Sequence, residues 1–284
     1  MVDFRVRPNG PEYSAYLEPR LVQIAADTHG SFGAYRAPRD TLESFIDQMD
    51  DAGIDIGVVA ARSRAATRSD WPYTRKVVAD AIEAKPDRLV GLIGLDVGDV
   101  PRACEEVRVA IAGSEPFIGV SFDPFQLNSG ADNPELLPIY DVCAELGCIV
   151  AITLGGLPGV PAELRCSSPL AIDAVAQKFR DLTIVASHAG WPFSYEMVAV
   201  AWRNANVYFE NSFYHHAPGT HVLVEAANEM IPKKMLYASA YPFAPMAETL
   251  AQFKRMPFAP DVLADILWAN PLQVIDATRA RLGK

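Results

Sequence analysis

Short apolar runs alternate along this chain with longer amphipathic stretches, and polar or glycine-containing breaks separate the two. An apolar run bounded by turn residues is typical of a buried strand, whereas apolar positions three and four apart are typical of a helix. Eight runs predict strands: residues 21–26, 54–61, 89–96, 118–123, 148–154, 182–187, 207–211 and 234–239. Helices are predicted over residues 38–52, 72–84, 135–146 and 169–179, near 194–203 and 220–230, through Glu105 and Val109, and twice after residue 239, around Pro257 and Pro260.

Eight strands that alternate with eight or more helices predict the α/β class and, within it, a (β/α)8 TIM barrel. We expect residues 21–284 to form this single barrel domain, with extra helices at its carboxyl end. Residues 1–20, which Pro and Gly interrupt, are expected to form a short irregular N-terminal arm on its surface. A doubly wound open sheet is the alternative, but the Gly-x-Gly-x-x-Gly typical of its first strand end is absent from the sequence.

Charge and composition narrow the range of partners. The chain has 25 Lys and Arg against 35 Asp and Glu, a formal net charge of −10, and no run of basic residues. We therefore expect a small-molecule substrate, and neither nucleic acid nor a membrane as a partner. The sequence shows no signal-peptide core and no membrane-spanning run, which predicts a cytoplasmic protein. Cys143 and Cys148 could be ligands or a redox pair, but buried, reduced thiols are the interpretation we favour.

Polar side chains follow the predicted strands at the point where each strand ends. In parallel α/β folds the carboxyl ends of the strands carry the chemistry. Asp27, His29 and Ser31 lie two residues apart and would share one face at the end of the first predicted strand. The later strand ends carry Arg62, Asp96, Ser121, Asp123, Thr153, His188, Glu210, Asn211, Ser212, Ser239 and Tyr241. We expect these groups to face one another across one end of the barrel.

Several of these stretches follow one another in a recognisable order. They are Asp27-Thr28-His29, Lys85-Pro86-Asp87-Arg88-Leu89-Val90-Gly91-Leu92, Pro138-Ile139-Tyr140 with Glu145-Leu146-Gly147, Ile184-Val185-Ala186-Ser187-His188-Ala189-Gly190-Trp191-Pro192, Tyr237-Ala238-Ser239-Ala240-Tyr241-Pro242-Phe243, and Asn270. Over residues 20–275 the chain resembles the amidohydrolase-related barrels. This branch of the amidohydrolase superfamily holds decarboxylases of aromatic and muconate-type acids and small-acid lactonases. The resemblance also implies a homodimer, because members of the family are often dimers.

The chain departs from this family at the positions that hold the family's metal ion. The resemblance implies His-x-His at the end of the first strand, His at the end of the fifth, and Asp before the Tyr-Pro that follows the eighth. This chain has Ser31, Thr153 and Ala240 there, so that only His29 and His188 remain. A catalytic zinc needs three protein ligands and an open position, which two imidazoles do not supply. We therefore expect no cofactor and a metal-independent protein.

A divalent metal such as zinc, completed by Asp27, Asp123 or Glu210, is the alternative. In the resembling enzymes the aspartate that Ala240 replaces also transfers the proton. We therefore expect His29, His188 and Asp123 to be the catalytic residues. The substrate-binding residues are expected to be Arg62, Thr153, Glu210, Tyr241 and Ser31. The two histidines could instead be hydrogen-bonded structural residues, with Asp27 orienting His29.

These observations predict an enzyme that acts without a metal on a small organic acid, lactone or cyclic carbonyl compound. Hydrolysis is the default class by resemblance. A non-hydrolytic lyase, decarboxylase or cyclase on the same barrel is the first alternative. A catalytically silent barrel that binds a ligand is the second.

Overall fold

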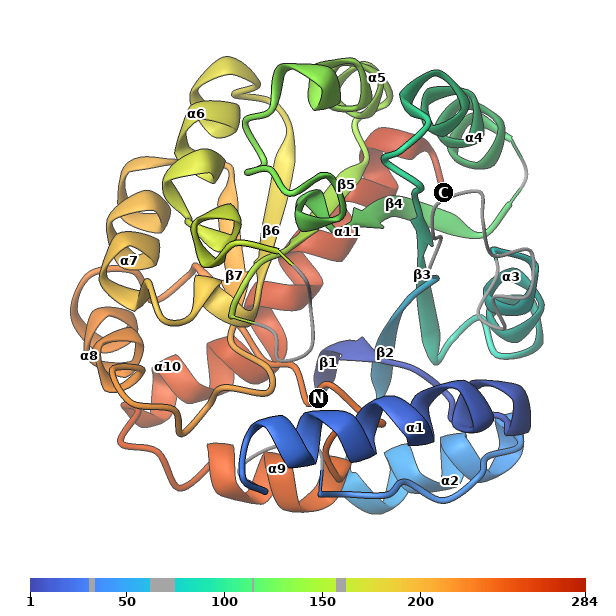
Figure 1. Cartoon of the computed structure of the whole chain (residues 1–284), viewed down its shortest axis with the longest axis vertical. Coiled ribbons are helices and arrows are strands. Elements are labelled where there is room, and N and C mark those ends of the chain that lie inside the picture. The colour runs from blue at the N-terminus through green and yellow to red at the C-terminus, as the bar shows by residue number, and fades with distance from the viewer. Residues whose placement is uncertain (31–33, 62–74, 114, 157–161) are drawn as a thin grey trace.

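In a computed structural model of the chain, eight parallel strands form one sheet in chain order, and helices surround them (Figure 1). The structure describes residues 1–30, 34–61, 75–113, 115–156 and 162–284. The strands are β1 (Val2–Val6), β2 (Ile56–Ala60), β3 (Leu89–Gly94), β4 (Phe117–Phe122), β5 (Ile149–Thr153), β6 (Thr183–Ser187), β7 (Val207–Glu210) and β8 (Met235–Leu236). This is the predicted (β/α)8 barrel.

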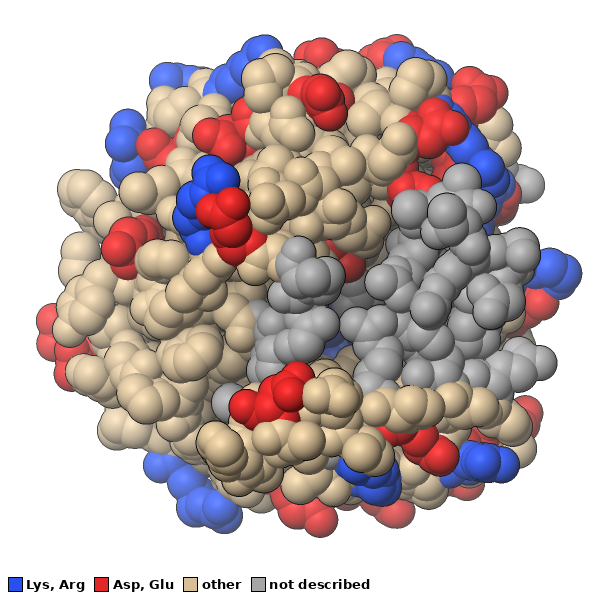
Figure 2. Space-filling view, in the orientation of Figure 1, with Lys and Arg blue, Asp and Glu red and all other residues tan. Residues whose placement is uncertain are grey.

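The helices are α1 (Pro11–Asp27), α2 (Leu42–Ala52), α3 (Arg75–Ala84), α4 (Val100–Ala112), α5 (Leu137–Leu146), α6 (Leu170–Lys178), α7 (Ser194–Arg203), α8 (His221–Glu229), α9 (Met246–Phe253), α10 (Pro260–Ala264) and α11 (Asn270–Leu282). Within the described ranges, no helix has both the length and the apolar character needed to cross a bilayer. Acidic and basic side chains are intermixed around the periphery of the face shown in Figure 2.

Local signals set the ends of these helices. At the start of α2, the Thr41 hydroxyl accepts a hydrogen bond from Ser44 N at 3.1 Å, and the Ser44 hydroxyl accepts one from Thr41 N at 2.9 Å. This reciprocal cap satisfies donors that the first turn of a helix leaves without partners. The helix ends at Gly53, whose φ of 71° favours a residue without a side chain.

Backbone hydrogen bonds between β1 and the segment after β8 close the barrel. Phe4 N donates to Tyr237 O at 2.8 Å, Ala240 N to Arg5 O at 3.1 Å, and Arg7 N to Tyr241 O at 3.1 Å. The seam therefore joins the beginning of the chain to its last strand. It leaves the carboxyl ends of all eight strands at one end of the barrel.

Two apolar layers hold this arrangement. The outer layer packs the strands against the surrounding helices and includes Phe45, Met49, Phe117 and Phe209. The inner layer fills the barrel with side chains such as Phe4, Leu92, Ile149, Val185 and Leu236. Val274 and Ile275 of α11 join the inner layer, and α11 crosses behind the strands in Figure 1. The helix therefore covers the amino-terminal end of the barrel.

Seven predicted strands overlap β2 to β8, but the first prediction is wrong. Residues 21–26 belong to α1, and the expected irregular arm over residues 1–20 contains β1 and most of that helix. The apolar run 21–26 continues a stripe that Tyr13, Leu17, Leu21 and Ile24 form on one buried face of the helix, with spacings of four, four and three. Val22, inside the same run, is 59% exposed.

The true first strand lacks the apolar pattern because charged residues occupy two of its five positions. Asp3 and Arg5 are nevertheless fully or almost fully buried, at 0% and 5% exposure. β1 pairs with β2 on one side and with the segment after β8 on the other. Partner strands and buried polar contacts therefore stabilise β1, and hydropathy alone does not reveal them.

Leu21 and Val22 provide a matched test of this correction. Because Leu21 is 2% exposed and Val22 is 59% exposed, we expect Leu21→Ala to lower the free energy of unfolding by about 2–5 kcal/mol. We expect Val22→Ala to change it by less than about 0.5 kcal/mol. Chemical denaturation of both variants measures the difference. Equal, large losses would indicate a strand buried on both faces at residues 21–26.

Candidate functional site at the centre of the barrel

The guanidinium of Arg5 lies inside the barrel, beside the carboxyl ends of β5, β6 and β7. Its Nη1 donates a hydrogen bond to Ser187 Oγ at 2.8 Å, and its Nη2 donates one to Thr153 Oγ1 at 3.3 Å. Nη1 also lies 3.9 Å from Glu210 Oε1. A buried cation is costly unless it is paired and hydrogen-bonded, and these three groups meet that need.

A β-bulge in β1 turns Arg5 toward the interior. Asp3 pairs with Gly57 and Val6 with Val59, so three steps along β1 match two steps along β2. The extra residue lets Phe4, which packs in the inner apolar layer, and Arg5 face the same way. The bulge therefore places a charged side chain directly above the apolar filling of the barrel.

Asp3 holds the bulge through its carboxyl group. Its Oδ1 accepts hydrogen bonds from Arg5 N and from Ser239 N, both at 3.0 Å. Burial raises the pKa of Asp3 to about 7, although the hydrogen bonds from Ser239 and Arg5 oppose this shift. The charge of Glu210 adds to the increase in the pKa of Asp3. Asp3 therefore ties β1 to the segment after β8 and changes its protonation near neutral pH.

His188 follows β6 directly and is held by the segment after β7. Its Nδ1 lies 2.8 Å from Ser212 O and 3.1 Å from Ser212 Oγ. A carbonyl oxygen can only accept, so in the neutral ring Nδ1 carries the proton and Nε2 carries the lone pair. The hydrogen bond thus selects the tautomer in which Nε2 is the basic nitrogen.

Glu210 links His188 to Arg5. Its Oε2 accepts a hydrogen bond from Ser212 N at 2.6 Å, which positions the residue that holds His188. Burial alone would raise the pKa of Glu210, but the positive charges of His188 and Arg5 and the hydrogen bonds from Ser212 lower it overall. Glu210 is therefore a carboxylate that neutralises the guanidinium and supports the histidine.

The backbone is strained just after three neighbouring strands. His188 after β6, Phe213 after β7 and Ala240 after β8 have φ values of 62°, 71° and 64°. Residues with side chains rarely adopt this left-handed region, and such strain clusters at functional sites. The strained residues surround the carboxyl end of the barrel where Arg5 and Glu210 lie.

Of the other predicted site residues, Asp123 and Thr153 occupy strand ends. Thr153 is 1% exposed and holds the guanidinium, as described above. Asp123 follows β4, is 4% exposed, and accepts a hydrogen bond from Gln126 Nε2 at 3.3 Å. Both residues stay candidates for the site.

Tyr241 is occupied elsewhere. Its hydroxyl donates to Asp40 Oδ2 at 2.7 Å, and the same oxygen accepts a hydrogen bond from Asn9 N at 2.8 Å. Asp40 Oδ1 accepts a hydrogen bond from Gln48 at 2.7 Å. Burial and the charge of Asp40 raise the pKa of Tyr241. This network fastens the segment before α2 to the end of the barrel, and the expected substrate contact of Tyr241 stays a prediction.

His29 is not at a strand end, in contrast to the sequence-based prediction. It lies in the turn that ends α1, exposed to solvent, with a φ of 51°. Asp27, expected to orient it, instead accepts a hydrogen bond from Gln23 Nε2 at 2.7 Å on the surface of the helix. The sequence motif therefore resembles a strand end but is the end of a helix. Arg62 and Ser31 lie outside the described residues.

Sequence reasoning missed Arg5 and Asp3 because it assigned residues 1–20 to an arm. The signal that could have found them is the alternation in Val2-Asp3-Phe4-Arg5-Val6-Arg7, in which three charged residues lie two apart. Arg5 lies in the true first strand and Arg7 directly follows it, with the same spacing as the His-x-His that the resemblance implies.

The residues at this centre do not fit a catalytic metal. Within the described ranges, no group of three or more His, Cys, Asp or Glu side chains is arranged to hold an ion. Arg5 instead places a permanent positive charge beside Glu210 and the hydroxyl groups of Thr153 and Ser187. The fixed positive charge of Arg5 already pairs with Glu210 at this position, and it would repel a second cation among these groups.

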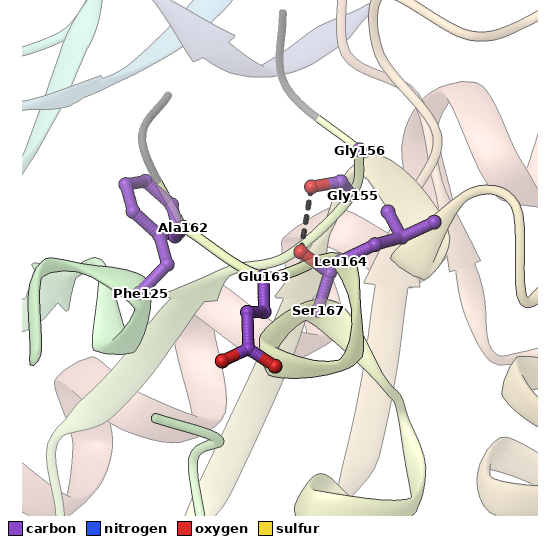
Figure 3. A pocket seen from close by; sticks show the side chains of 7 residues that line it. All are labelled: Phe125, Gly155, Gly156, Ala162, Glu163, Leu164 and Ser167. Carbon is purple, nitrogen blue, oxygen red and sulfur yellow. Dashed lines mark hydrogen bonds between the residues drawn. The ribbon is translucent and has the colours of Figure 1, made fainter. Parts of the chain in front are cut away.

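A small cavity of about 170 Å³ lies beside this centre, at the segments that follow β4 and β5 (Figure 3). It is lined by Phe125, Gly155, Gly156, Ala162, Glu163, Leu164 and Ser167. The Ser167 hydroxyl donates to Gly155 O at 2.6 Å, the dashed contact in Figure 3. Gly155 has a φ of 91°, and a Cβ there would lie 3.1 Å from His188 Cβ. One glycine therefore separates the cavity from His188.

Comparison with known proteins shows the family to which this chain belongs. A family model described as amidohydrolase matches residues 26–276. The chain belongs to this amidohydrolase family, as the resemblance in its sequence implied. None of the curated proteins compared with it matches.

Solved structures share the fold over nearly the whole chain. An uncharacterised TIM-barrel protein from Bordetella bronchiseptica is 26% identical, with a TM-score of 0.77 and coverage of 100% of this chain and 99% of that one. A dihydroxybenzoic acid decarboxylase from Polaromonas sp. JS666, with bound manganese, is 16% identical, with a TM-score of 0.74 and coverage of 99% and 98%. A 5-carboxyvanillate decarboxylase from Sphingomonas paucimobilis is 17% identical, with a TM-score of 0.69 and coverage of 97% and 98%.

Asp3→Asn tests the electrostatics of the bulge. Folding raises the pKa of Asp3 from 3.8 to about 7, so between these values the folded protein binds a proton that the unfolded chain does not. The wild-type carboxyl therefore makes folding less favourable as the pH rises through this window. The asparagine keeps an accepting oxygen and does not titrate. We expect the free energy of unfolding of the variant, relative to wild type, to increase from about pH 4 to about pH 7 and then to level off.

Urea denaturation at stepped pH values measures this difference. Wild type and variant are compared at each pH, which cancels the titration of all other groups. A difference that does not change with pH would contradict the buried, neutralised state of Asp3.

Proposed function

We propose that this protein is a metal-independent enzyme of the amidohydrolase family that acts on a small organic acid, lactone or cyclic carbonyl compound. The observation that carries the proposal is the Arg5 guanidinium, held by Thr153, Ser187 and Glu210 among the strand ends of the barrel. A fixed cation at this position can bind a carboxylate or stabilise an oxyanion that develops on a carbonyl oxygen. It needs no bound ion to do so.

His188 is the proposed proton-transfer residue. Its tautomer leaves the basic lone pair on Nε2, and Ser212 and Glu210 hold the ring in place. Histidine titrates nearest to neutral pH, so it can accept a proton from water and return it to a leaving group. Asp123 after β4 is the second proposed catalytic group, because its carboxyl group is buried at the same end of the barrel.

Hydrolysis is the reaction we assign first. In it, His188 would remove a proton from water, and Arg5 would stabilise the negative charge that forms on the attacked carbonyl oxygen. The histidine would then protonate the leaving oxygen or nitrogen, so that the proton is returned and the enzyme is restored. Thr153 and Ser187 position the guanidinium for this role.

Decarboxylation is the second candidate function. It is favoured by solved structures of the same fold whose proteins are decarboxylases of hydroxylated aromatic acids. Here Arg5 would bind an oxygen of the substrate. His188, first protonated at Nε2 by solvent, would deliver that proton to the carbon as its bond to the carboxylate breaks and carbon dioxide leaves, and it would then take another proton from solvent. Release of an acid from lactones and release of carbon dioxide from carboxylates distinguish the two reactions.

We also propose a small molecule as the partner, and neither nucleic acid nor a membrane. The net charge of −10 and the absence of a basic run in the sequence support this proposal. The four cysteines are free thiols in the structure, in keeping with the cytoplasmic location that we propose.

The two histidines provide a matched test of the active centre. Because His188 is buried at the strand ends and His29 is exposed at a helix end, we expect His188→Gln to lower turnover by about 100- to 10,000-fold. We expect His29→Gln to leave turnover unchanged. Both are assayed on panels of lactones, cyclic amides and small carboxylates, with circular dichroism to confirm folding.

Arg5→Lys is the companion variant, since it keeps the charge but loses the forked donor geometry. We expect it to raise KM or to lower kcat for every substrate that the wild-type protein turns over. Unchanged turnover in the His188 variant would overturn the proposed mechanism. Absence of turnover on all panels, with ligand-induced stabilisation, would instead indicate a silent binding barrel.

A further inference from the structure

The cavity at the ends of β4 and β5 is lined mainly by uncharged groups (Figure 3). Phe125, in the turn after β4, and Leu164, in the turn after β5, supply its large apolar side chains. Among its described lining residues Glu163 alone is charged, and its carboxylate is paired with Arg165. A lining that has a carboxylate and no cation would repel an anion. The cavity therefore suits an uncharged part of a ligand.

The backbone polar groups in the glycine wall of this cavity already have partners. The Ser167 hydroxyl donates to Gly155 O at 2.6 Å, and Gly156 N donates to Trp191 O at 2.7 Å. The Tyr214 hydroxyl donates to Gly156 O at 3.1 Å. These groups are satisfied within the protein, so the wall offers a ligand chiefly apolar contact.

The size of the cavity matches one small ring. It measures about 170 Å³. An apolar cavity of roughly 150 Å³ is large enough to bind benzene. A single six-membered ring, or a branched chain of similar size, is therefore the group that this space can hold.

Gly156 leaves this space open although its own backbone does not require a glycine. Its φ lies outside the left-handed region, so a residue with a side chain could adopt its conformation. A Cβ at this position would lie 3.0 Å from Leu164 Cδ1 and 3.6 Å from Trp191 Cζ3. The missing side chain therefore enlarges the cavity on the side that faces Leu164.

The same wall reaches the proposed proton-transfer residue. The ring of Tyr214, whose hydroxyl holds Gly156, lies edge-on to the ring of His188, with 5.8 Å between the centroids and an angle of 89° between the planes. A Cβ on Gly155 would lie 3.1 Å from His188 Cβ. The cavity and the candidate site therefore share a wall one residue thick, which places both within the span of one small molecule.

We propose that this cavity binds the part of the substrate that does not react, an uncharged apolar group about the size of one six-membered ring. Gly156 and Leu164 set the limit on its size. The inference rests on the proposed function in one respect, because Arg5 must bind the acidic or carbonyl end of the same molecule. It narrows the substrate class to acids, lactones or cyclic carbonyl compounds that carry one apolar substituent.

Isothermal titration calorimetry with three pairs of acids tests the cavity without requiring turnover. The pairs are acetate and phenylacetate, propanoate and 3-phenylpropanoate, and butanoate and 4-phenylbutanoate, which vary the distance between the carboxylate and the ring. We expect the phenyl group to lower Kd at least about tenfold in at least one pair. A naphthyl group on the same chain should give no such gain, because two fused rings exceed the space.

Variants of the cavity wall test which residues set the size limit. Gly156→Ala should remove most of the phenyl gain, because its Cβ would meet Leu164 Cδ1. Adding Leu164→Ala to this variant should restore the gain, and Leu164→Ala alone should admit the naphthyl group. Since Leu164 is 49% exposed, its truncation should cost little stability. Gly10→Ala is the matched control, because a Cβ there would have no heavy atom within 4 Å, and it should leave every Kd unchanged.

The outcomes separate this proposal from the proposed function. Equal Kd values within every pair, with the short acids bound, would overturn the cavity proposal and leave the proposed function standing. Absence of binding by all six acids would overturn the premise that Arg5 holds the acidic end, and the cavity proposal with it. A full phenyl gain in Gly156→Ala, its loss in Gly10→Ala, or an equal gain from the naphthyl group in wild type would each overturn the assignment of the cavity.

Discussion

The buried guanidinium of Arg5 is the constraint on which the rest of this site depends. A permanent charge at 5% exposure inside a barrel must be balanced, because the low-dielectric interior does not solvate it. Glu210 supplies the opposite charge, and the hydroxyl groups of Thr153 and Ser187 accept hydrogen bonds from the guanidinium of Arg5. The side chain of Arg5 thereby links β1 to three adjacent strands, β5, β6 and β7.

The same constraint orders the neighbours of Arg5. The bulge that turns Arg5 inward leaves backbone donors that Asp3 must satisfy, and Asp3 in turn ties β1 to Ser239. Glu210 pairs with the guanidinium through one side of its carboxylate and holds Ser212 through the other, so His188 is positioned through the same carboxylate. The charge of Arg5, the hydrogen bond between Glu210 and Ser212 and the tautomer of His188 therefore depend on one carboxylate. In the proposed enzyme, this centre would supply positive charge from a covalently attached group.

Most of the barrel could be predicted from the sequence, and the part that could not has a clear cause. Strands β2 to β8 are buried on both faces, so their apolar runs are visible in the sequence. β1 carries Asp3 and Arg5, whose burial depends on partners more than 150 residues away, such as Ser187 and Ser239. Local hydropathy cannot report such contacts. The run at residues 21–26 is apolar for a different reason, since it belongs to the buried stripe of α1. His188, Thr153 and Glu210 were accessible to prediction because each follows or ends an apolar strand, whereas His29 was misplaced together with the helix that carries it.

The metal content of the active protein tests the central claim most directly. The chain is purified without chelator, its zinc, manganese and iron are measured by elemental analysis, and turnover is compared before and after dialysis against a chelator. A cationic centre built on Arg5 predicts metal far below one ion per chain and unchanged turnover. Near-stoichiometric zinc or manganese, lost together with turnover on chelation and restored with it when the metal is returned, would contradict this account.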